Sequence, residues 1–180
     1  MKVSVLIPVY NEAKTVIDVL DLVKNAAFEK EIILVDDGSA DKTRNILKER
    51  FGNGDKTLKI LYHMANKGKG RAVRTALSHA TGDYCVIQDA DMEYSPASIV
   101  KMAQFVADTG REAVYGSRFL QTRKSTSFPH YLVNWFLTFL TNILFRCSLT
   151  DMETCYKMVR TDILRDLDLR AEGFELEPEI

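Results

Sequence analysis

The chain has 180 residues, of which 46% are hydrophobic and 27% are charged, and its formal net charge at pH 7 is −1. This length fits one well-packed domain, and the composition is that of an ordinary soluble globular protein. A net charge so close to zero excludes a global attraction to nucleic acid or to an anionic membrane, so nucleic acid is not an expected partner and any membrane attraction must be local.

Apolar runs alternate with helical patterns along the first two thirds of the chain. Strands are predicted at Val3–Val9, Glu31–Val35, Leu58–Tyr62, Asp83–Gln88 and Ala113–Ser117. Helices are predicted at about Ala13–Ala27, from near Asp41, at Gly70–Ala80, and from Ser95-Pro96 with Ser95 as the N-cap and Pro96 at the first position. Repeated β-α-β units predict an α/β fold with a mostly parallel, doubly wound sheet flanked by helices in a single domain.

The segment after Ser117 has a different character. Phe119–Pro129 has no clear period and is predicted to be a loop. Tyr131–Leu149 is strongly apolar, but polar residues recur in it at helical spacing, which makes it too short and too polar for a membrane span. We predict an amphipathic helix, either packed on the sheet or lying in a membrane interface, and the pattern alone favours packing on the sheet.

Acidic clusters directly follow three of the predicted strands. They are Asn11-Glu12, Asp36-Asp37-Gly38-Ser39 and Asp89-Ala90-Asp91. In an open α/β sheet, ligands bind outside the carboxyl ends of the strands, so we expect the three clusters to meet at one edge of the sheet. An edge lined by carboxylates suits a cation or the hydroxyls of a sugar and a ribose, which indicates a site for a metal-bound nucleotide derivative.

Asp89-x-Asp91 is the strongest single signal. Residues i and i+2 at a strand end point to the same side, so the two carboxylates can face one ion. Mg²⁺ or Mn²⁺ is commonly held by one or two carboxylates, with phosphates and water completing the shell. Glu93 is a candidate third, outer ligand or a solvated side chain. The alternative is that Asp89 and Asp91 form an Asx turn or cap the next helix.

The other two acidic clusters offer contacts to a nucleotide. Asp36 or Asp37 could accept hydrogen bonds from a base edge or a ribose hydroxyl, while Gly38 lets the backbone turn close to the ligand. Tyr10 could stack on a base and Glu12 could bond a ribose. The alternatives are a turn followed by helix capping, half-buried packing of the tyrosine, and a helix cap at the residue after it.

Basic residues occur at two further places. The run Asn66–Arg71, which contains Lys69, resembles an anion-binding loop before a helix, and a solvated basic turn is an equal alternative. Arg118 follows a predicted strand and can fork onto a phosphate, and Arg123 and Lys124 come after it in the predicted loop.

Asp151 opens a dense polar cluster that continues through Glu153–Lys157. Its carboxylate could help to arrange a sugar or an acceptor. The alternative is a turn that leads into a strand.

The cysteines and the amino terminus bear on location. The three cysteines form no CxxC pair and have no zinc spacing, and the three histidines share no ligand spacing, so the thiols are expected to be reduced and the histidines structural or exposed. The first ten residues are too short an apolar stretch for a signal peptide. The functional face is therefore expected to be cytosolic.

The motifs PVYNE, VDDGS, NKGKG, GDY…QDADMEYSP, YGSRF and DMETCYK occur in this order. This ordered set resembles the family-two inverting glycosyltransferases, and among them the dolichyl- or polyprenyl-phosphate sugar transferases. The resemblance covers nearly all of the chain. It implies a glycosyltransferase A-type (Rossmann-like) fold over residues 1–180, with a nucleotide-binding part at about 1–91 and an acceptor-binding part at about 92–180. It also implies a UDP- or GDP-sugar donor, Mg²⁺ or Mn²⁺, and a polyprenyl phosphate acceptor.

The residues and the resemblance together predict a site. Around the nucleotide sugar they place Pro8, Tyr10, Glu12, Asp36, Asp37, Lys69, Asp89, Ala90 and Asp91. The predicted metal ligands are Asp89, Asp91 and Glu93; the predicted catalytic residues are Asp89, Asp91, Arg118 and Asp151; the predicted contacts to the acceptor phosphate are Arg118, Arg123 and Lys124.

The chain departs from the family pattern at two places. In mannose synthases a glutamine commonly stands where Glu93 stands here, which argues against mannose as the sugar. The family usually continues past the sequence GFELEPEI with another helix, strands and a basic segment, so the C-terminal end of the family domain is expected to be missing.

A phosphate acceptor also explains the absence of an obvious catalytic base. A phosphate monoester is already anionic at pH 7, so one in-line displacement with inversion needs no general base. A lipid acceptor favours the membrane-interface reading of the aromatic-rich segment Tyr131–Leu149, and a peripheral location at the cytosolic face of a membrane. The rivals are transfer to a soluble saccharide or protein with Asp151 or Glu153 as the base, a nucleotidyltransferase, and a non-catalytic nucleotide-sugar-binding scaffold.

Overall fold

The structure is a computed structural model that describes residues 1–52, 54–55, 57–92, 94–118 and 128–180. Its strands are β1 (Val3–Val9), β2 (Lys30–Asp36), β3 (Leu58–Tyr62), β4 (Tyr84–Ile87), β5 (Ala113–Tyr115) and β6 (Lys157–Arg160). Its helices are α1 (Val16–Asn25), α2 (Thr43–Phe51), α3 (Lys69–Leu77), α4 (Ala97–Thr109), α5 (Phe128–Phe145), α6 (Thr161–Asp166) and α7 (Leu176–Glu179).

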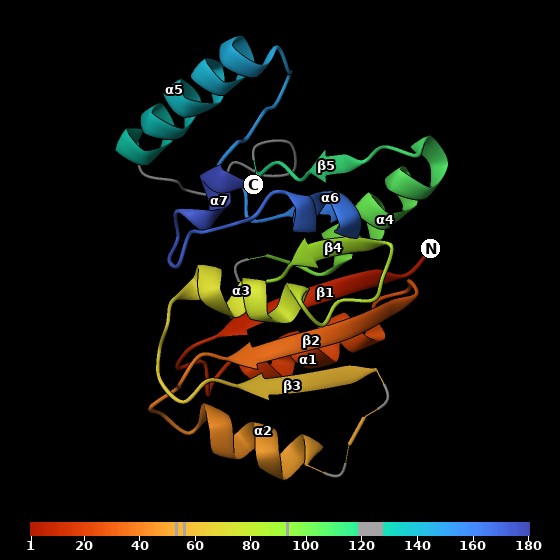
Figure 1. The fold of residues 1–180 in the computed structure, drawn as a ribbon, viewed down its shortest axis with the longest axis vertical. Coiled ribbons are helices and arrows are strands. Elements are labelled where there is room, and N and C mark those ends of the chain that lie inside the picture. Colours follow the sequence, from red (N-terminus) through yellow and green to blue (C-terminus); the bar gives the residue numbers. More distant parts are fainter. Residues whose placement is uncertain (53, 56, 93, 119–127) are drawn as a thin grey trace.

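The strands form one six-stranded sheet in the order β3-β2-β1-β4-β6-β5 (Figure 1). The first four strands along the chain are parallel, whereas β6 runs antiparallel to both of its neighbours, β4 and β5. The predicted α/β fold with a mostly parallel sheet is confirmed. Strand β6 lies where the sequence predicts a strand only as one of two alternatives.

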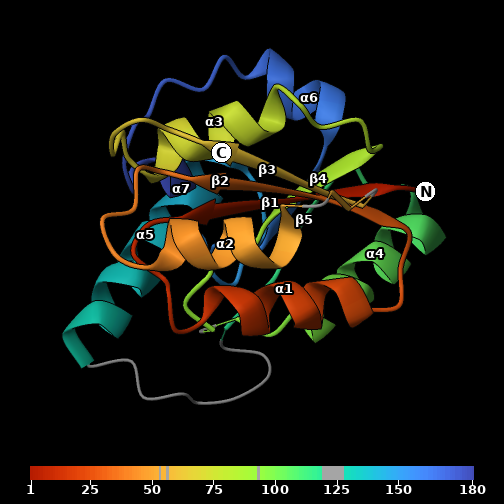
Figure 2. The same cartoon turned by 90° about the horizontal axis from the view of Figure 1, so that it is seen from below.

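The sheet is covered on both faces, which explains why its central strands are apolar throughout. Every residue of β1 is buried, as expected for a strand with helices on both sides. Val5 and Ile7 point into a core cluster shared with α1 and α4, whereas Leu6 points into a second cluster shared with α3 and α6. Figure 2 shows α1, α2 and α4 below the sheet and α3 and α6 above it.

Two predicted helix starts shift by a few residues. The helix predicted from Ala13 begins at Val16, and the helix predicted from Pro96 begins at Ala97, with Pro96 itself in the N-cap position. Ser95 still accepts a hydrogen bond at its Oγ from the Ala97 amide, at 3.4 Å. Helix ends are the least sharply specified part of a sequence pattern.

Helix α5 lies at one end of the molecule, clear of the sheet (Figures 1 and 2). The interpretation that this segment packs on the sheet is therefore wrong, although an amphipathic helix does form. Among the residues that the structure describes, no helix is long and apolar enough to cross a membrane.

Candidate functional site

The loops after β1 and β2 are joined to each other at the carboxyl edge of the sheet. Asn11 has a left-handed backbone, with φ of 58°, and its Oδ1 accepts hydrogen bonds from the amides of Ala40 at 2.8 Å and Asp41 at 3.2 Å. The amide of Asn11 in turn donates to Ser39 Oγ at 2.9 Å. Asn11 therefore ties two loops together and is not the cap of α1, whose N-cap is Thr15.

Three predicted nucleotide contacts lie at the end of β1 and in the loop that follows it. Pro8 is buried within β1, whereas the ring of Tyr10 is 47% exposed at the rim. Glu12 is partly buried, and its Oε2 accepts a hydrogen bond from the Thr15 hydroxyl at 2.7 Å. Of these three residues, only Tyr10 is exposed.

Asp36 and Asp37 are both buried and both engaged inside the protein. Asp36 accepts a hydrogen bond from Arg44 Nε at 2.6 Å. Asp37 Oδ1 lies 2.6 Å from His63 Nδ1, and its Oδ2 accepts from the Gly68 amide at 2.8 Å. Asp37 therefore fastens the loop before α3 to the end of β2. His63, which the sequence indicated only as structural or exposed, is its partner.

Gly38 is required by a contact within the protein. Its φ is +73°, and a Cβ at this position would lie 2.4 Å from the carbonyl carbon of Ala65. Gly38 thus allows two loops of the protein to approach each other closely, and not the backbone to approach a ligand as expected.

The basic run before α3 is covered by the C-terminal part of the chain. A Cβ at Gly68 would lie 2.2 Å from the carbonyl oxygen of Glu172, and a Cβ at Gly70 would lie 2.3 Å from that of Ala171. The Arg71 amide donates to the same Glu172 oxygen at 3.3 Å. Protein backbone thus occupies the place at the start of α3 that the anion-binding reading would give to a phosphate.

Lys69 belongs to a row of alternating charges formed by Asp89, Lys69, Glu177 and Lys157, whose side chains are mostly shielded from solvent. Its Nζ is 2.7 Å from Asp89 Oδ1 and 2.9 Å from Glu177 Oε1. Glu177 Oε2 lies 3.4 Å from Lys157 Nζ, which also donates to the Glu177 carbonyl. Glu177 and Lys157 were not among the predicted site residues, because nothing in the pattern of the sequence connects them to Asp89.

Burial and charge perturb the pKa values in this cluster. Burial lowers the pKa of Lys69, but the carboxylates of Asp89 and Glu177 outweigh this effect and raise it above its ordinary value. Burial, together with the nearby Asp89, raises the pKa of the Cys155 thiol. Lys69 is therefore a permanent cation at neutral pH, and Cys155 is a neutral thiol.

The Asp89-Ala90-Asp91 motif follows β4, and its two aspartates differ in exposure. Asp89 is partly buried, Ala90 is packed in the core, and Asp91 is exposed. Met92 has a left-handed backbone, with φ of 64°, a conformation that costs energy for a residue other than glycine and is enriched at functional sites. Glu93 lies outside the described residues.

Asp89 and Asp91 fit a divalent cation whose remaining ligands are phosphates and water. Within the described part of the chain, no three His, Cys, Asp or Glu side chains gather closely enough to hold a metal by themselves. Asp89 and Asp91 supply two carboxylates, which is the number that Mg²⁺ commonly takes when phosphates and water complete its shell.

Arg118 and Asp151 form a bidentate ion pair. Arg118 Nε donates to Asp151 Oδ2 and Arg118 Nη2 donates to Asp151 Oδ1, both at 2.8 Å. The Asp151 side chain is completely buried, and Asn134 Nδ2 donates to its Oδ1 at 2.9 Å. Burial raises the pKa of Asp151, but the hydrogen bonds from Arg118 and Asn134 hold it below its ordinary value. Asp151 thus positions Arg118, and its lowered pKa makes it a poor general base. Arg123 and Lys124 lie outside the described residues.

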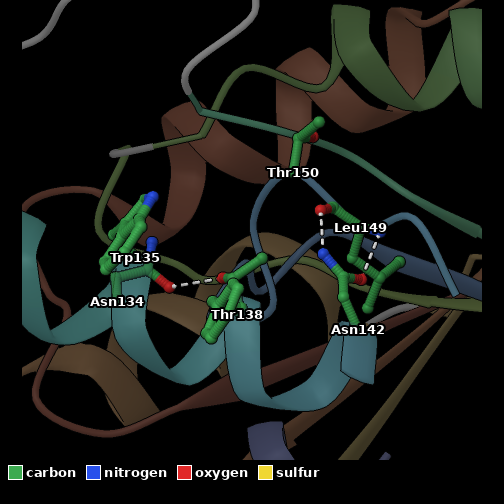
Figure 3. A pocket seen from close by; sticks show the side chains of 7 residues that line it. Asn134, Trp135, Thr138, Asn142, Leu149 and Thr150 are labelled. Atoms are coloured by element: carbon green, nitrogen blue, oxygen red, sulfur yellow. Dashed lines mark hydrogen bonds between the residues drawn. The ribbon is translucent and has the colours of Figure 1, made fainter. Parts of the chain in front are cut away.

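Helix α5 turns its polar side toward the protein. Asn142 exchanges two hydrogen bonds with the backbone of Leu149, and Thr138 Oγ1 accepts from the Met152 amide at 3.1 Å. A cavity of about 280 Å³ lies between this side of α5 and the segment around Leu149 (Figure 3). Trp135 and Phe139 line this cavity as well. The large apolar residues of α5 are 39–75% exposed: Leu132, Val133, Trp135, Phe136, Phe139, Leu140, Ile143, Leu144 and Phe145.

Comparison with known proteins places this chain in a family. Dolichol-phosphate mannosyltransferase from Pyrococcus furiosus is 32% identical over 133 residues, which are 73% of this chain and 37% of that protein. UDP-N-acetylglucosamine–dolichyl-phosphate N-acetylglucosaminyltransferase from Methanococcus voltae is 31% identical over 192 residues, which cover 96% of this chain and 76% of that protein.

Solved structures show the same fold. Glucosyl-3-phosphoglycerate synthase from Mycobacterium tuberculosis, in complex with Mn²⁺, UDP and glucosyl-3-phosphoglycerate, superposes with a TM-score of 0.68 at 20% identity, over 98% of this chain and 62% of that one. This chain therefore spans less than two thirds of that enzyme and little more than a third of the Pyrococcus relative. The model of glycosyl transferase family 2 matches residues 4–168, and the chain belongs to this family.

Proposed function

We propose that this chain moves a hexosyl group from a UDP- or GDP-sugar to a polyprenyl phosphate, with inversion and with Mg²⁺ or Mn²⁺ at Asp89 and Asp91. The observation that carries the proposal is the connection between Arg118 and α5. Asp151 binds both the guanidinium of Arg118 and the amide of Asn134 on α5. A cation suited to a phosphate is thereby fixed beside a helix that exposes an apolar surface.

This arrangement matches the two ends of a lipid phosphate. Arg118 retains 34% exposure of its side chain, so this side chain is accessible from solvent. The exposed aromatic residues of α5 include Trp135 stacked on Phe139, with ring centroids 5.6 Å apart. Amphipathic aromatic side chains favour the membrane–water interface, where the headgroup of a polyprenyl phosphate lies. We infer a peripheral location at a membrane, at its cytosolic face.

The chemistry needs positioning and charge stabilisation more than proton transfer. The acceptor oxygen is anionic at pH 7, because the second pKa of a phosphate monoester is about 6. Asp89 and Asp91 would hold a divalent ion, which would supply positive charge to the nucleoside diphosphate. Arg118 orients the acceptor phosphate, and Tyr10 offers a stacking face to the base of the donor. A soluble acceptor would need a general base, a role for which Asp151 is poorly suited because the hydrogen bonds from Arg118 and Asn134 lower its pKa and thus its affinity for a proton.

Replacement of Asp91 by Ala tests the metal and donor assignment. We expect the affinity for UDP or GDP in the presence of Mn²⁺ to fall by about 10- to 100-fold, because half of the carboxylate set is lost. Isothermal titration of both proteins measures this change. Asp108→Ala, which removes an exposed carboxylate from α4, serves as the control and should bind as the unaltered protein does. Equal nucleotide affinity in Asp91→Ala and the unaltered protein would refute the assignment.

A further inference from the structure

The carboxylate that would bind a divalent metal already has a cation beside it. Lys69 Nζ lies 2.7 Å from Asp89 Oδ1, and the lysine and aspartate side chains are only 12% and 18% exposed. An ion pair this poorly solvated is screened much less than one at the surface. A metal ion that binds Asp89 must therefore compete with Lys69.

Lys69 has other partners that would hold it when Asp89 is taken. Glu177 Oε1 lies 2.9 Å from the ammonium group, and the ring of Phe174 has its centroid 5.7 Å away. Both partners come from the C-terminal segment, which also covers the start of α3. Donor phosphates held by a metal ion at Asp89 would bring further negative charge near the Lys69 ammonium group, which lies 2.7 Å from Asp89 Oδ1.

We propose that Lys69 acts as an internal substitute for the metal: it neutralises Asp89 in the nucleotide-free protein, gives up this carboxylate when the divalent ion binds, and then faces the donor phosphates. The proposal rests on the metal site of the proposed function and adds a positioning role for Lys69. It implies that metal alone binds weakly and that metal and nucleotide bind well only together. A cation retained without a metal also keeps Asp89 and Glu177 from repelling each other.

The proposal predicts opposite effects of one substitution on two ligands. In Lys69→Met, Mn²⁺ without nucleotide should bind about tenfold more tightly, because its competitor is gone. In the same variant, UDP in the presence of saturating Mn²⁺ should bind more weakly, by about three- to tenfold, because one cation facing the phosphates is lost. Electron paramagnetic resonance of free Mn²⁺ measures the first affinity, and isothermal titration measures the second.

Two matched variants separate this role from a general effect of charge. Lys67→Met removes an exposed lysine from the same loop and should leave the Mn²⁺ affinity within about twofold, because an exposed charge is screened. Lys69→Arg keeps the charge and should retain weak binding of metal alone. Circular dichroism verifies that each variant is folded. If Lys69→Met does not fold, Lys69→Arg provides the test. Mn²⁺ binding that is tenfold tighter in Lys69→Arg than in the unaltered protein would overturn the proposal.

The outcomes also distinguish this inference from the proposed function. If Asp91→Ala binds Mn²⁺ as well as the unaltered protein does, the metal site itself is wrong. If Asp91→Ala loses Mn²⁺ but Lys69→Met binds it no more tightly, only the role of Lys69 is overturned. Equal tightening in Lys67→Met and Lys69→Met would likewise overturn it, because the effect would then be one of net charge.

Discussion

Asp151 shows how one buried carboxylate can connect Arg118 to helix α5. It accepts hydrogen bonds from the guanidinium and the backbone amide of Arg118 and from the side chain of Asn134. Burying a carboxylate is costly, and a bidentate arginine with an additional amide donor offsets that cost. The charge on Asp151 therefore connects the stability of the protein to the placement of Arg118.

Asp151→Asn is expected to lower the free energy of unfolding by about 3 kcal/mol at pH 7, because it leaves Arg118 without its counter-charge. The folded-state pKa of Asp151 lies below its ordinary value of 3.8. The stabilisation is therefore complete above that pH and is lost as the pH falls toward the lower folded-state pKa. Urea unfolding at pH 7 and near pH 3 should show a difference between the two proteins that shrinks in acid.

The exposed ion pair of Asp168 and Arg170, at 2.9 Å, provides the control. Its side chains are 79% and 83% exposed, so Asp168→Asn should change stability by less than about 0.5 kcal/mol. A difference for Asp151→Asn that stays constant from pH 7 to pH 3 would contradict the role given to its charge.

For single residues, the sequence predicts where along the sheet each one lies, but not which side chains it contacts. The acidic clusters could be assigned to strand ends because each follows an apolar run directly. The pairing of Lys69 with Glu177, and of Asp37 with His63, depends on segments that only the folded chain brings together. Gly38 illustrates the same limit, since a glycine in a turn does not reveal which surface approaches it.

Among the helices and strands, α5 is the one for which the spacing of polar residues does not predict which side faces the protein. Its spacing of polar residues predicts an amphipathic helix correctly, but polar residues are normally expected to face water. Here Asn134, Thr138 and Asn142 face the protein, because Asp151 and the backbone of residues 149–152 bind them. Strand β6 was difficult to predict for a simpler reason: between Lys157 and Arg160 it has only two apolar residues, which are too few to indicate a strand.

Trp135 makes the docking of α5 measurable, because it is the only tryptophan in the chain and is 54% exposed on the apolar side of this helix. We expect its fluorescence to shift to shorter wavelength when vesicles containing polyprenyl phosphate are added, and the protein to float with the vesicles. Ile143→Asp should reduce the partition by more than tenfold, because burial of an isoleucine side chain contributes about 2 kcal/mol and a charge opposes it.

Leu22→Asp is the matched control for this experiment. Leu22 is 46% exposed, but it lies on α1, which is below the sheet in Figure 2 and far from α5 in Figure 1. Its substitution should leave flotation unchanged. An unshifted Trp135 spectrum, or an equal loss of flotation in both variants, would show that α5 is not the docking surface.

At the scale of the whole molecule, parallel strands bring distant loops to one rim. The carboxyl ends of β1, β2 and β4 carry Tyr10, Asp37 and Asp89, and the registers of β1 with its two neighbours align these ends. The α/β architecture and this rim could be predicted, because continuous apolar strands alternate with helices. The cover that residues 171–177 form over the start of α3 could not, since it depends on contacts made late in the chain.

Transfer of a labelled sugar to lipid acceptors that differ only in the phosphate tests the central claim most directly. Vesicles would contain either a short polyprenyl phosphate or the corresponding polyprenol, with a panel of UDP- and GDP-sugars and Mn²⁺. We predict that one donor labels the polyprenyl phosphate alone, and that chelation of the metal or Asp91→Ala abolishes the label. Labelling of the polyprenol, or of a soluble saccharide while the polyprenyl phosphate stays unlabelled, would contradict the account.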